Sequence, residues 1–267
     1  MKILIVTSDY PPEIRSASKL IYDLRNHLID IGYETDVVTT NSKYNIDKTW
    51  EYSDDIRVSA PIRVNVFSHR NISYYLRGLS QLLMPFQFMK AIRKQLNKKY
   101  DLVIIYSPPL TLGLVGVFLK LKWNTTTVLN VQDLFPQNAI DLGILRNKLL
   151  IYLFKYIEKV CYQKNDWITF HSVSNLKFIS KIYPKLIDSK SLVLHNWQKF
   201  PEKLKVNNSY VYQKYGIDKS KKIAIFAGVL GPAQGLNNLI QLAKNAQFKN
   251  NDWQFLVLGD GAEKEAL

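Results

Sequence analysis

The sequence predicts an α/β fold of the doubly wound, Rossmann-like kind, with one complete domain followed by the start of a second. Three observations predict it. Short β-branched apolar runs recur along the chain, helical patterns lie between most of them, and the alternation restarts near residue 223 after a polar segment. Buried parallel strands are near-continuous apolar runs, and alternating strands and helices build parallel sheets. With 47% hydrophobic and 22% charged residues, the chain has the composition of a packed globular protein.

The first element is KILIVT (2–7), an apolar run typical of a buried parallel strand. A polar turn, SDYPPEIRS, leads into a helical pattern, which Ser16 or Ser18 can cap at its start and Gly32 can end. ETDVVTT (34–40) is the next strand. Together these elements predict a βαβ unit, whose crossover should be right-handed.

The same rhythm then repeats along the chain. It predicts strands at 63–67, 102–106, 126–131, 167–171 and 191–195, and helices around 75–99, 111–122, 148–164 and 174–182. We therefore expect residues 1–195 to form the first domain and the polar, lysine-rich residues 196–222 to form a linker with a short helix. Residues 223–267 give only one strand–helix–strand unit, which cannot cover both faces of a sheet, so we expect this second domain to be incomplete.

Charge is the unusual feature of the composition: 36 basic and 22 acidic residues give a net charge of +14. This excess predicts a polyanionic partner, whether nucleic acid, anionic membrane or phosphorylated substrate. Residues 57–100 hold nine basic residues and no acidic one, interleaved with aromatic and aliphatic side chains. Such a segment is typical of a surface that docks on an anionic bilayer. The docking residues would be Arg70, Arg77, Lys90, Arg93 and Lys94.

Two alternatives compete with membrane docking. The basic segment can be a core-facing helix with a solvated basic side, and some of its apolar residues must be core. Nucleic acid is the second alternative, but no helix-turn-helix, zinc-finger or RNA-recognition signature accompanies the charge, so membrane docking is favoured and no nucleic acid is expected as the partner.

The remaining composition excludes several classes of protein. The single cysteine, Cys161, excludes a disulfide scaffold and a cysteine-built zinc site, and fits a reducing compartment. The four histidines show no metal-ligand spacing, so no metal or other cofactor is expected. No apolar run reaches ~18 residues and no signal segment precedes the first strand. We expect a cytoplasmic protein.

Polar residues follow the predicted strands at the edge where open parallel sheets bind ligands. Alone, each can be a turn residue or a helix cap, but their coincidence at one edge favours a ligand cleft. They are Ser8 to Pro12, Ser107 to Pro109, Gln132 and Asp133, His171 and Ser172, Asn196 and Trp197, and Gly228 to Gly235.

Asp133 is the sharpest single candidate, because a carboxylate between a buried strand and Leu134-Phe135-Pro136 would be partly desolvated. It would then suit a general base or a hydrogen bond to a hydroxyl. An Asx-turn or a helix N-cap explains it as well. His171 and His195 fit structural roles better. Ser16 either presents backbone N–H groups to a phosphate or simply caps the helix.

FAGVLGPAQG (226–235) is a strand, a glycine-rich turn and the start of a helix, an arrangement that can hold a phosphate. Its spacing is neither G-x-G-x-x-G nor a P-loop. The turn after the first strand carries no glycine, so a nicotinamide-dependent dehydrogenase is not expected.

Taken together, these segments resemble the family-4 glycosyltransferases of the GT-B fold, in particular a bacterial surface-polysaccharide branch that includes fucosamine-transferase-like enzymes. The resemblance is carried along the whole chain by MKILIVTSDYPPE, GYETDVVTT, YDLVIIYSPPLTLGL, VLNVQDLFPQNAIDLGIL, LHNW, FAGVLGPAQGLNNLI and FLVLGDGAEKEAL. VQDLFP and AGVLGPAQG are its most specific segments.

The resemblance implies two Rossmann-like domains, the first holding a lipid-linked saccharide acceptor at the inner membrane face and the second a nucleotide-sugar donor, usually a UDP-sugar. Transfer would retain the anomeric configuration and need no metal. Asp133 would lie beside the acceptor hydroxyl, with Ser107 and Asn196 on the acceptor side. Donor-side residues would be Ser16, Gly228, Gly231, Gln234 and Gly235.

The sequence departs from the family pattern in three places. Val229 and Gln234 stand where many relatives carry an arginine and a lysine, and Ser16-Ala17-Ser18 replaces a glycine pair. The family's glutamate pair, eight residues apart, would fall beyond residue 267. We therefore expect little or no transfer by this chain alone. The alternative to an enzyme is a non-catalytic, membrane-docked subunit or remnant that binds an acceptor or a nucleotide.

Overall fold

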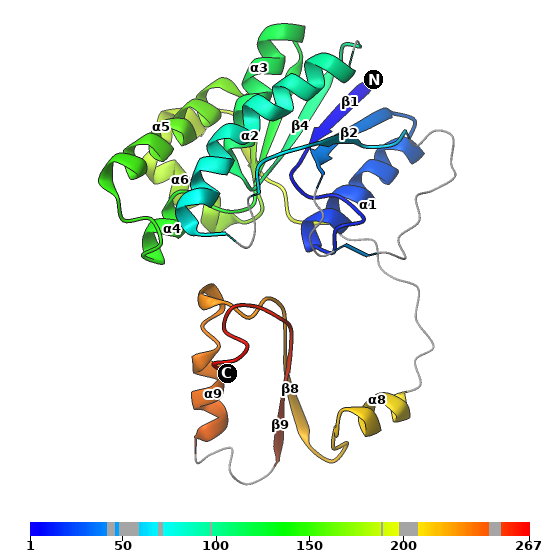
Figure 1. Ribbon diagram of the computed structural model, residues 1–267, viewed down its shortest axis with the longest axis vertical. Helices are drawn as coiled ribbons and strands as arrows, with labels where there is room; N and C mark the ends of the chain where they lie inside the picture. Colours follow the sequence, from blue (N-terminus) through cyan, green and yellow to red (C-terminus); the bar gives the residue numbers. More distant parts are fainter. Residues whose placement is uncertain are drawn as a thin grey trace. The chain divides into compact units, whose positions relative to one another are not determined.

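The computed structural model describes residues 1–41, 46–47, 59–68, 72–96, 98–187, 189–197, 208–245 and 252–267. The chain divides into two compact units, unit 1 (Met1–Lys199) and unit 2 (Phe200–Leu267) (Figure 1). The division falls inside the expected linker, 196–222, which also holds the short helix α8 (Asn208–Lys214).

Unit 1 is built on a seven-stranded sheet in the order β3-β2-β1-β4-β5-β6-β7, with every pairing parallel. This confirms the predicted doubly wound α/β fold. The strands are β1 (Lys2–Val6), β2 (Glu34–Thr40), β3 (Ile62–Val64), β4 (Leu102–Ser107), β5 (Thr126–Val131), β6 (Trp167–Phe170) and β7 (Ser191–Val193).

Helices cover the two faces of this sheet unequally (Figure 1). α1 (Ser16–Asp30) packs on one face against Ile3, Ile5 and Val37. The other face carries the larger core, to which these helices contribute: α2 (Tyr74–Gln95), η1 (Leu110–Leu112), α3 (Gly113–Trp123), α5 (Lys148–Lys164) and α6 (Val173–Ile182). Two short helices, α4 (Gln137–Asp141) and α7 (Pro184–Ile187), lie in the connections.

Several predicted boundaries need correction. α1 has Arg15 at its N-cap position and no side-chain cap, so the prediction that Ser16 or Ser18 caps the helix is wrong. α2 ends at Gln95 instead of residue 99, because Lys98 and Tyr100 turn toward Asp36. Both contact the same carboxylate oxygen, each at 2.6 Å. Gly32 follows α1 with φ +90°, a left-handed conformation that favours glycine and ends the helix as expected.

Unit 2 contains a parallel pair, β8 (Lys222–Ala227) and β9 (Trp253–Leu258), with η2 (Pro232–Gln234) and α9 (Asn237–Lys244) between them in sequence. These elements match the predicted strand, glycine-rich turn, helix and strand. Large apolar side chains of the pair remain exposed within the described residues: Ile223, Ile225, Trp253, Val257 and Leu258. A two-stranded sheet with only short described helices beside it leaves this apolar surface uncovered.

Candidate functional site

The carboxyl edge of the unit 1 sheet gathers acidic and aromatic side chains. Tyr106, near the end of β4, is buried, and its pKa is raised by burial and by the charges of Asp9 and Asp133. Asp9 follows β1, Asp133 follows β5, and His171 follows β6. The charge of His171 acts on Asp133 in turn. The structure therefore brings together at one edge four side chains, Tyr106 within β4 and three that follow other strands.

Asp133 is accessible to solvent, yet desolvation by the surrounding protein raises the pKa of its carboxyl group above the usual range, and the charge of His171 opposes this rise. The carboxylate accepts no hydrogen bond within the described part of the chain. The N-cap of α4 is Pro136, so the helix-cap alternative for Asp133 is wrong. An accessible carboxylate with a raised pKa is suited to accept a proton from a bound hydroxyl.

Asp133→Asn is expected to increase the free energy of unfolding at neutral pH. The folded-state pKa of Asp133 lies above its unfolded value, so the ionised carboxylate is disfavoured by folding. The increase in the free energy of unfolding should be largest at pH values above the pKa of Asp133 in the folded protein. It should vanish as the pH falls below the pKa of Asp133 in the unfolded chain. Urea titrations between pH 3 and 8 measure it, with Asp141→Asn as an exposed control. A loss of stability at neutral pH would mean that the carboxylate has a structural role.

The turn after β1 is held by ion pairs that sequence reasoning did not find. The Arg15 guanidinium lies 3.4 Å from Asp9 Oδ1 and 3.3 Å from Glu13 Oε1, at the first residue before α1. Ser8 Oγ donates to Asp9 Oδ2 at 2.5 Å and lies 3.0 Å from the Pro108 carbonyl oxygen, which ties this turn to the end of β4. The only sequence signal for Arg15 is a basic residue beside two acids in a turn.

The predicted residues of unit 1 occupy different environments. Ser16 is the first residue of α1 and is exposed, in a first turn without acidic residues. Ser107 ends β4 and is 1% exposed, and its hydroxyl has no partner within the described residues, so it lies beneath the edge. Asn196 is exposed in the segment after β7. His171 and His195 are joined, with His195 Nδ1 3.0 Å from the His171 carbonyl oxygen.

The glycine-rich segment of unit 2 lies at the carboxyl ends of β8 and β9. Gly231 precedes η2, Gln234 ends it, and Gly235 follows with φ +58°. Gln234 and Gly235 are exposed, whereas Gly231 is buried. Gly228 donates its backbone N–H to the Leu258 carbonyl at 2.9 Å, at the end of β9. The loop is exposed at Gly228 and Val229 and again from Pro232 to Gly235, shortly before α9.

The G-D-G segment after β9 packs against this loop. A Cβ at Gly259 would overlap the Gly228 carbonyl oxygen, and one at Gly261 would overlap the Leu230 carbonyl oxygen. Leu230 N–H donates to the Asp260 carbonyl at 3.0 Å. The close backbone approach requires glycine at both positions and fixes the loop that follows β8.

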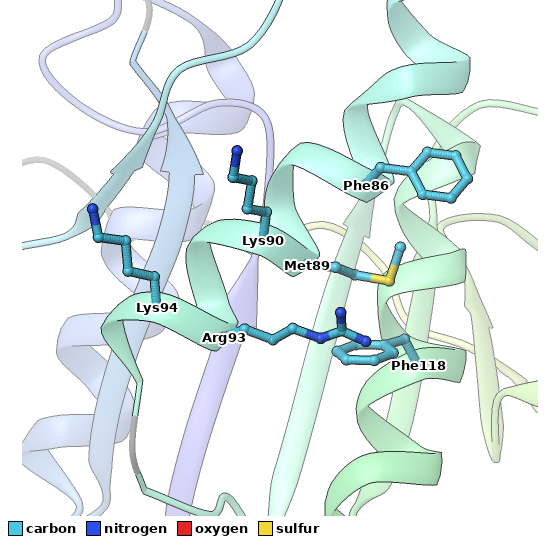
Figure 2. A pocket seen from close by; sticks show the side chains of 6 residues that line it. All are labelled: Phe86, Met89, Lys90, Arg93, Lys94 and Phe118. Carbon is cyan, nitrogen blue, oxygen red and sulfur yellow. The ribbon is translucent and has the colours of Figure 1, made fainter.

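Three of the predicted docking residues line a hollow of about 540 Å³ on α2: Lys90, Arg93 and Lys94. Phe86, Met89 and Phe118 supply its apolar lining (Figure 2). The Arg93 guanidinium lies 4.6 Å from the centroid of the Phe118 ring, so a cation–π contact holds it over the ring. Arg77 is half-buried in α2. Arg70 lies outside the described residues.

The described part of the chain lacks two further features, a membrane-spanning helix and a cluster of metal ligands. None of its helices is both long enough and apolar enough to cross a bilayer. Nor do three or more His, Cys, Asp or Glu side chains in these ranges gather as metal ligands.

The chain is similar in sequence to two bacterial proteins named as glycosyltransferases, although no protein-family profile matches it. It is 28% identical over 196 residues to the probable glycosyltransferase WbjE of Pseudomonas aeruginosa, covering 70% of this chain and 46% of that protein. It is 22% identical to the putative colanic acid biosynthesis glycosyl transferase WcaI of Escherichia coli K12, covering 100% of this chain and 68% of that protein. The chain thus spans about half the length of WbjE.

Solved structures show the same fold at lower sequence identity. WaaG, a glycosyltransferase involved in lipopolysaccharide biosynthesis, has a TM-score of 0.64 and 13% identity, covering 99% of this chain and 65% of WaaG. The catalytic domain of Arabidopsis thaliana starch synthase IV has a TM-score of 0.65 and 10% sequence identity, and the match covers 98% of this chain and 69% of that structure. Anabaena HepE in complex with UDP-glucose has a TM-score of 0.59 and 14% sequence identity, and the match covers 97% of this chain and 61% of HepE. The chain therefore has the Rossmann-like α/β fold of GT-B glycosyltransferases, and its sequence is similar to those of two proteins named as glycosyltransferases.

Proposed function

We propose that the chain is a glycosyltransferase polypeptide that acts on a nucleotide-sugar donor and a lipid-linked or glycan acceptor in the synthesis of a bacterial surface polysaccharide. The observation that carries the proposal is the cluster at the carboxyl edge of unit 1, where Asp133, Asp9, Tyr106 and His171 meet. Sequence similarity to WbjE and WcaI supports the reaction class. The HepE complexes with UDP and glucose, and with UDP-glucose, support a UDP-sugar as donor.

In this proposal Asp133 accepts a hydrogen bond from the acceptor hydroxyl, and its raised pKa favours proton transfer from that hydroxyl. Ser107 and Asn196 belong to the acceptor side. The transfer retains the anomeric configuration and uses no metal, as in the family that the sequence resembles.

Each unit has its own candidate segment for the donor: the backbone around Ser16 in unit 1, and the loop of Gly228, Gly231, Gln234 and Gly235 in unit 2. Ser16 begins a 15-residue helix with no acid in its first turn and no side-chain cap, and such N–H groups favour an anion. The exposed Gln234 and Gly235 precede α9, whose first turn also holds no acid. Because Val229 and Gln234 are uncharged, backbone N–H groups would carry most of the diphosphate interaction.

The proposal includes docking of unit 1 on the inner face of the plasma membrane through Arg70, Arg77, Lys90, Arg93 and Lys94. The hollow beside α2 supports it, since three of these cations adjoin the apolar side chains Phe86 and Phe118. A variant with Lys90→Gln, Arg93→Gln and Lys94→Gln should bind vesicles containing phosphatidylglycerol at least tenfold more weakly, at about 1 kcal/mol per lost charge.

Flotation with phosphatidylglycerol and with pure phosphatidylcholine vesicles measures this effect. A variant with Lys177→Gln, Lys181→Gln and Lys185→Gln, three exposed lysines outside the hollow, serves as the charge-matched control, and duplex and single-stranded DNA serve as competing polyanions. Equal binding of both variants, or binding of DNA in preference to vesicles at moderate salt, would contradict membrane docking.

We expect the 267-residue chain by itself to transfer sugar from UDP-sugars slowly or not at all. The exposed apolar residues Ile223, Ile225, Val257 and Leu258 support this expectation, because they leave the sheet of the donor-binding unit without a covered core. They also favour the second candidate function, a non-catalytic subunit that another polypeptide completes. Product analysis after incubation with radiolabelled UDP-sugars and lipid extracts measures transfer. Rapid turnover by the purified chain would contradict both the expectation and the second candidate.

A further inference from the structure

α5 exposes an apolar stripe that points away from the core of unit 1. Its buried side chains are Phe154, Glu158, Cys161 and Tyr162. Helical periodicity places a different set together on the opposite side, with spacings of three and four residues. This exposed set is Leu149 (75% exposed), Tyr152 (73%), Leu153 (38%) and Tyr156 (58%). The stripe is not needed to hold α5 on the sheet.

α2 exposes a matching stripe. Its core side chains are Ser80, Met84, Phe88 and Ile92, while Leu76, Leu79, Leu83 and Phe86 are exposed on the other side. The same spacing continues past Phe86 to Lys90 and Arg93, so the apolar stripe ends at the basic hollow.

The two helices lie on the same face of the sheet, and α3 packs against both of them (Figure 1). A Cβ placed on Gly78 of α2 would lie 3.9 Å from the ring of Phe154 on α5. The exposed stripes of α2 and α5 together are here called the α2–α5 face. It is defined by Leu76, Leu79, Leu83 and Phe86 with Leu149, Tyr152, Leu153 and Tyr156.

The charge around this face has one sign. α2 contains no acidic residue, and the single acid of α5, Glu158, is buried. Each helix carries four basic side chains: Arg77, Lys90, Arg93 and Lys94 on α2, and Lys148, Lys155, Lys159 and Lys164 on α5. Lysine stems beside apolar side chains and tyrosines are typical of a protein surface at the level of lipid headgroups.

We propose that α5 is a second membrane-docking helix, and that the whole α2–α5 face contacts an anionic bilayer. This deepens the proposed function, since it rests on membrane docking through α2. Charge complementarity selects the occupant: anionic headgroups match the lysines of both helices while the apolar stripes enter the interface. Two contact helices define an orientation of unit 1 on the membrane, which a single helix would not.

Site-specific labelling tests the proposal on the intact chain. Burial raises the pKa of Cys161 to about 12, so the natural thiol reacts poorly and an introduced cysteine takes the label. Tyr152→Cys reports on α5, Leu76→Cys on α2, and Ile31→Cys, exposed after α1 on the opposite face of the sheet, is the control. Each is labelled with bimane and mixed with phosphatidylglycerol vesicles that contain brominated lipid.

Quenching at positions 152 and 76 but not 31 is the expected result. Quenching at 76 without 152 would overturn the role of α5 and leave α2 docking intact. Absence of quenching at all three positions would overturn membrane docking as well. Light scattering could instead detect a dimer without lipid that Tyr152→Ser dissociates. That result would assign the α5 stripe to a second copy of the chain and overturn the proposal.

A second measurement avoids the label. Tyr152→Ser with Tyr156→Ser should weaken vesicle partitioning about tenfold, because two exposed rings no longer enter the interface. Ile31→Ser should leave partitioning unchanged. Thermal unfolding without vesicles checks that both variants fold, and equal partitioning of folded variants would contradict the proposal.

Discussion

Arg25→Ala is expected to lower the free energy of unfolding of unit 1 by about 3–5 kcal/mol. Arg25 lies on α1, is 0% exposed, and is the largest fully buried side chain among the described residues. Its guanidinium donates to the carbonyl oxygens of Thr35 (3.3 Å) and Ser59 and to the hydroxyls of Tyr10 (3.1 Å) and Ser59 (3.1 Å). Truncation removes the arginine's N–H donors from the buried Thr35 carbonyl and Tyr10 hydroxyl and creates a cavity.

The network extends beyond Arg25. Ser59 Oγ donates to Asp36 Oδ1 at 2.6 Å, and Tyr100 donates to Asp36 Oδ2 at 2.6 Å, so the arginine joins α1, β2 and the segment before β4. Arg25→Lys should have an intermediate effect, because lysine keeps the charge without the planar fork of donors. Urea unfolding measures both variants, with the exposed Arg146→Ala as control. An effect of Arg25→Ala below about 1 kcal/mol would contradict this account of the network.

Glu158→Gln is expected to remove a pH dependence of stability worth about 3 kcal/mol. Burial raises the pKa of Glu158 from 4.5 to about 7. A hydrogen bond donated by the Tyr183 hydroxyl at 3.0 Å opposes this rise but does not cancel it. Between these two pH values the unfolded chain releases the proton and the folded chain keeps it, so raising pH favours unfolding. The free energy of unfolding of the wild type therefore begins to fall near pH 4.5 and stops falling just above pH 7. Between these values it falls by about 1.4 kcal/mol per pH unit.

Glutamine keeps an oxygen that can accept the Tyr183 hydrogen bond and carries no charge, so the variant should lack this pH dependence. Its free energy of unfolding should match that of the wild type near pH 4.5 and exceed it at pH 8. Urea titrations across this range measure the difference, with the exposed Glu265→Gln as control. Parallel curves for wild type and Glu158→Gln would contradict the raised pKa.

The sequence was sufficient for the architecture because buried parallel strands leave a strong local pattern. The apolar runs at 34–40 and 126–131 are strands with those bounds, and the helical pattern at 148–164 is α5. The carboxyl-edge cluster also followed, since parallel strands end at one edge. The expectation that Asp133 lies among polar groups there agrees with the charges acting on it and on Tyr106.

Features that depend on distant partners did not follow from the sequence. Arg25 was not recognised as buried, because its acceptors on Thr35 and Ser59 come from other segments. The predicted end of α2 was late, because Lys98 binds Asp36 across the fold. α5 is apolar on two sides, and periodicity alone does not identify the side that meets the sheet. Only packing shows that Phe154 is buried while Tyr152 is exposed.

A nuclear magnetic resonance titration with UDP tests the central claim most directly, because it detects weak donor binding without requiring turnover. We predict that UDP shifts the backbone amides of Ser16, Gly231, Gln234 and Gly235, with or without EDTA, while inorganic diphosphate shifts them less. Asp133 should shift only when a saccharide acceptor is also present. Unchanged amides at these positions up to about 10 mM UDP, or identical shifts with inorganic diphosphate, would contradict a nucleotide-sugar site.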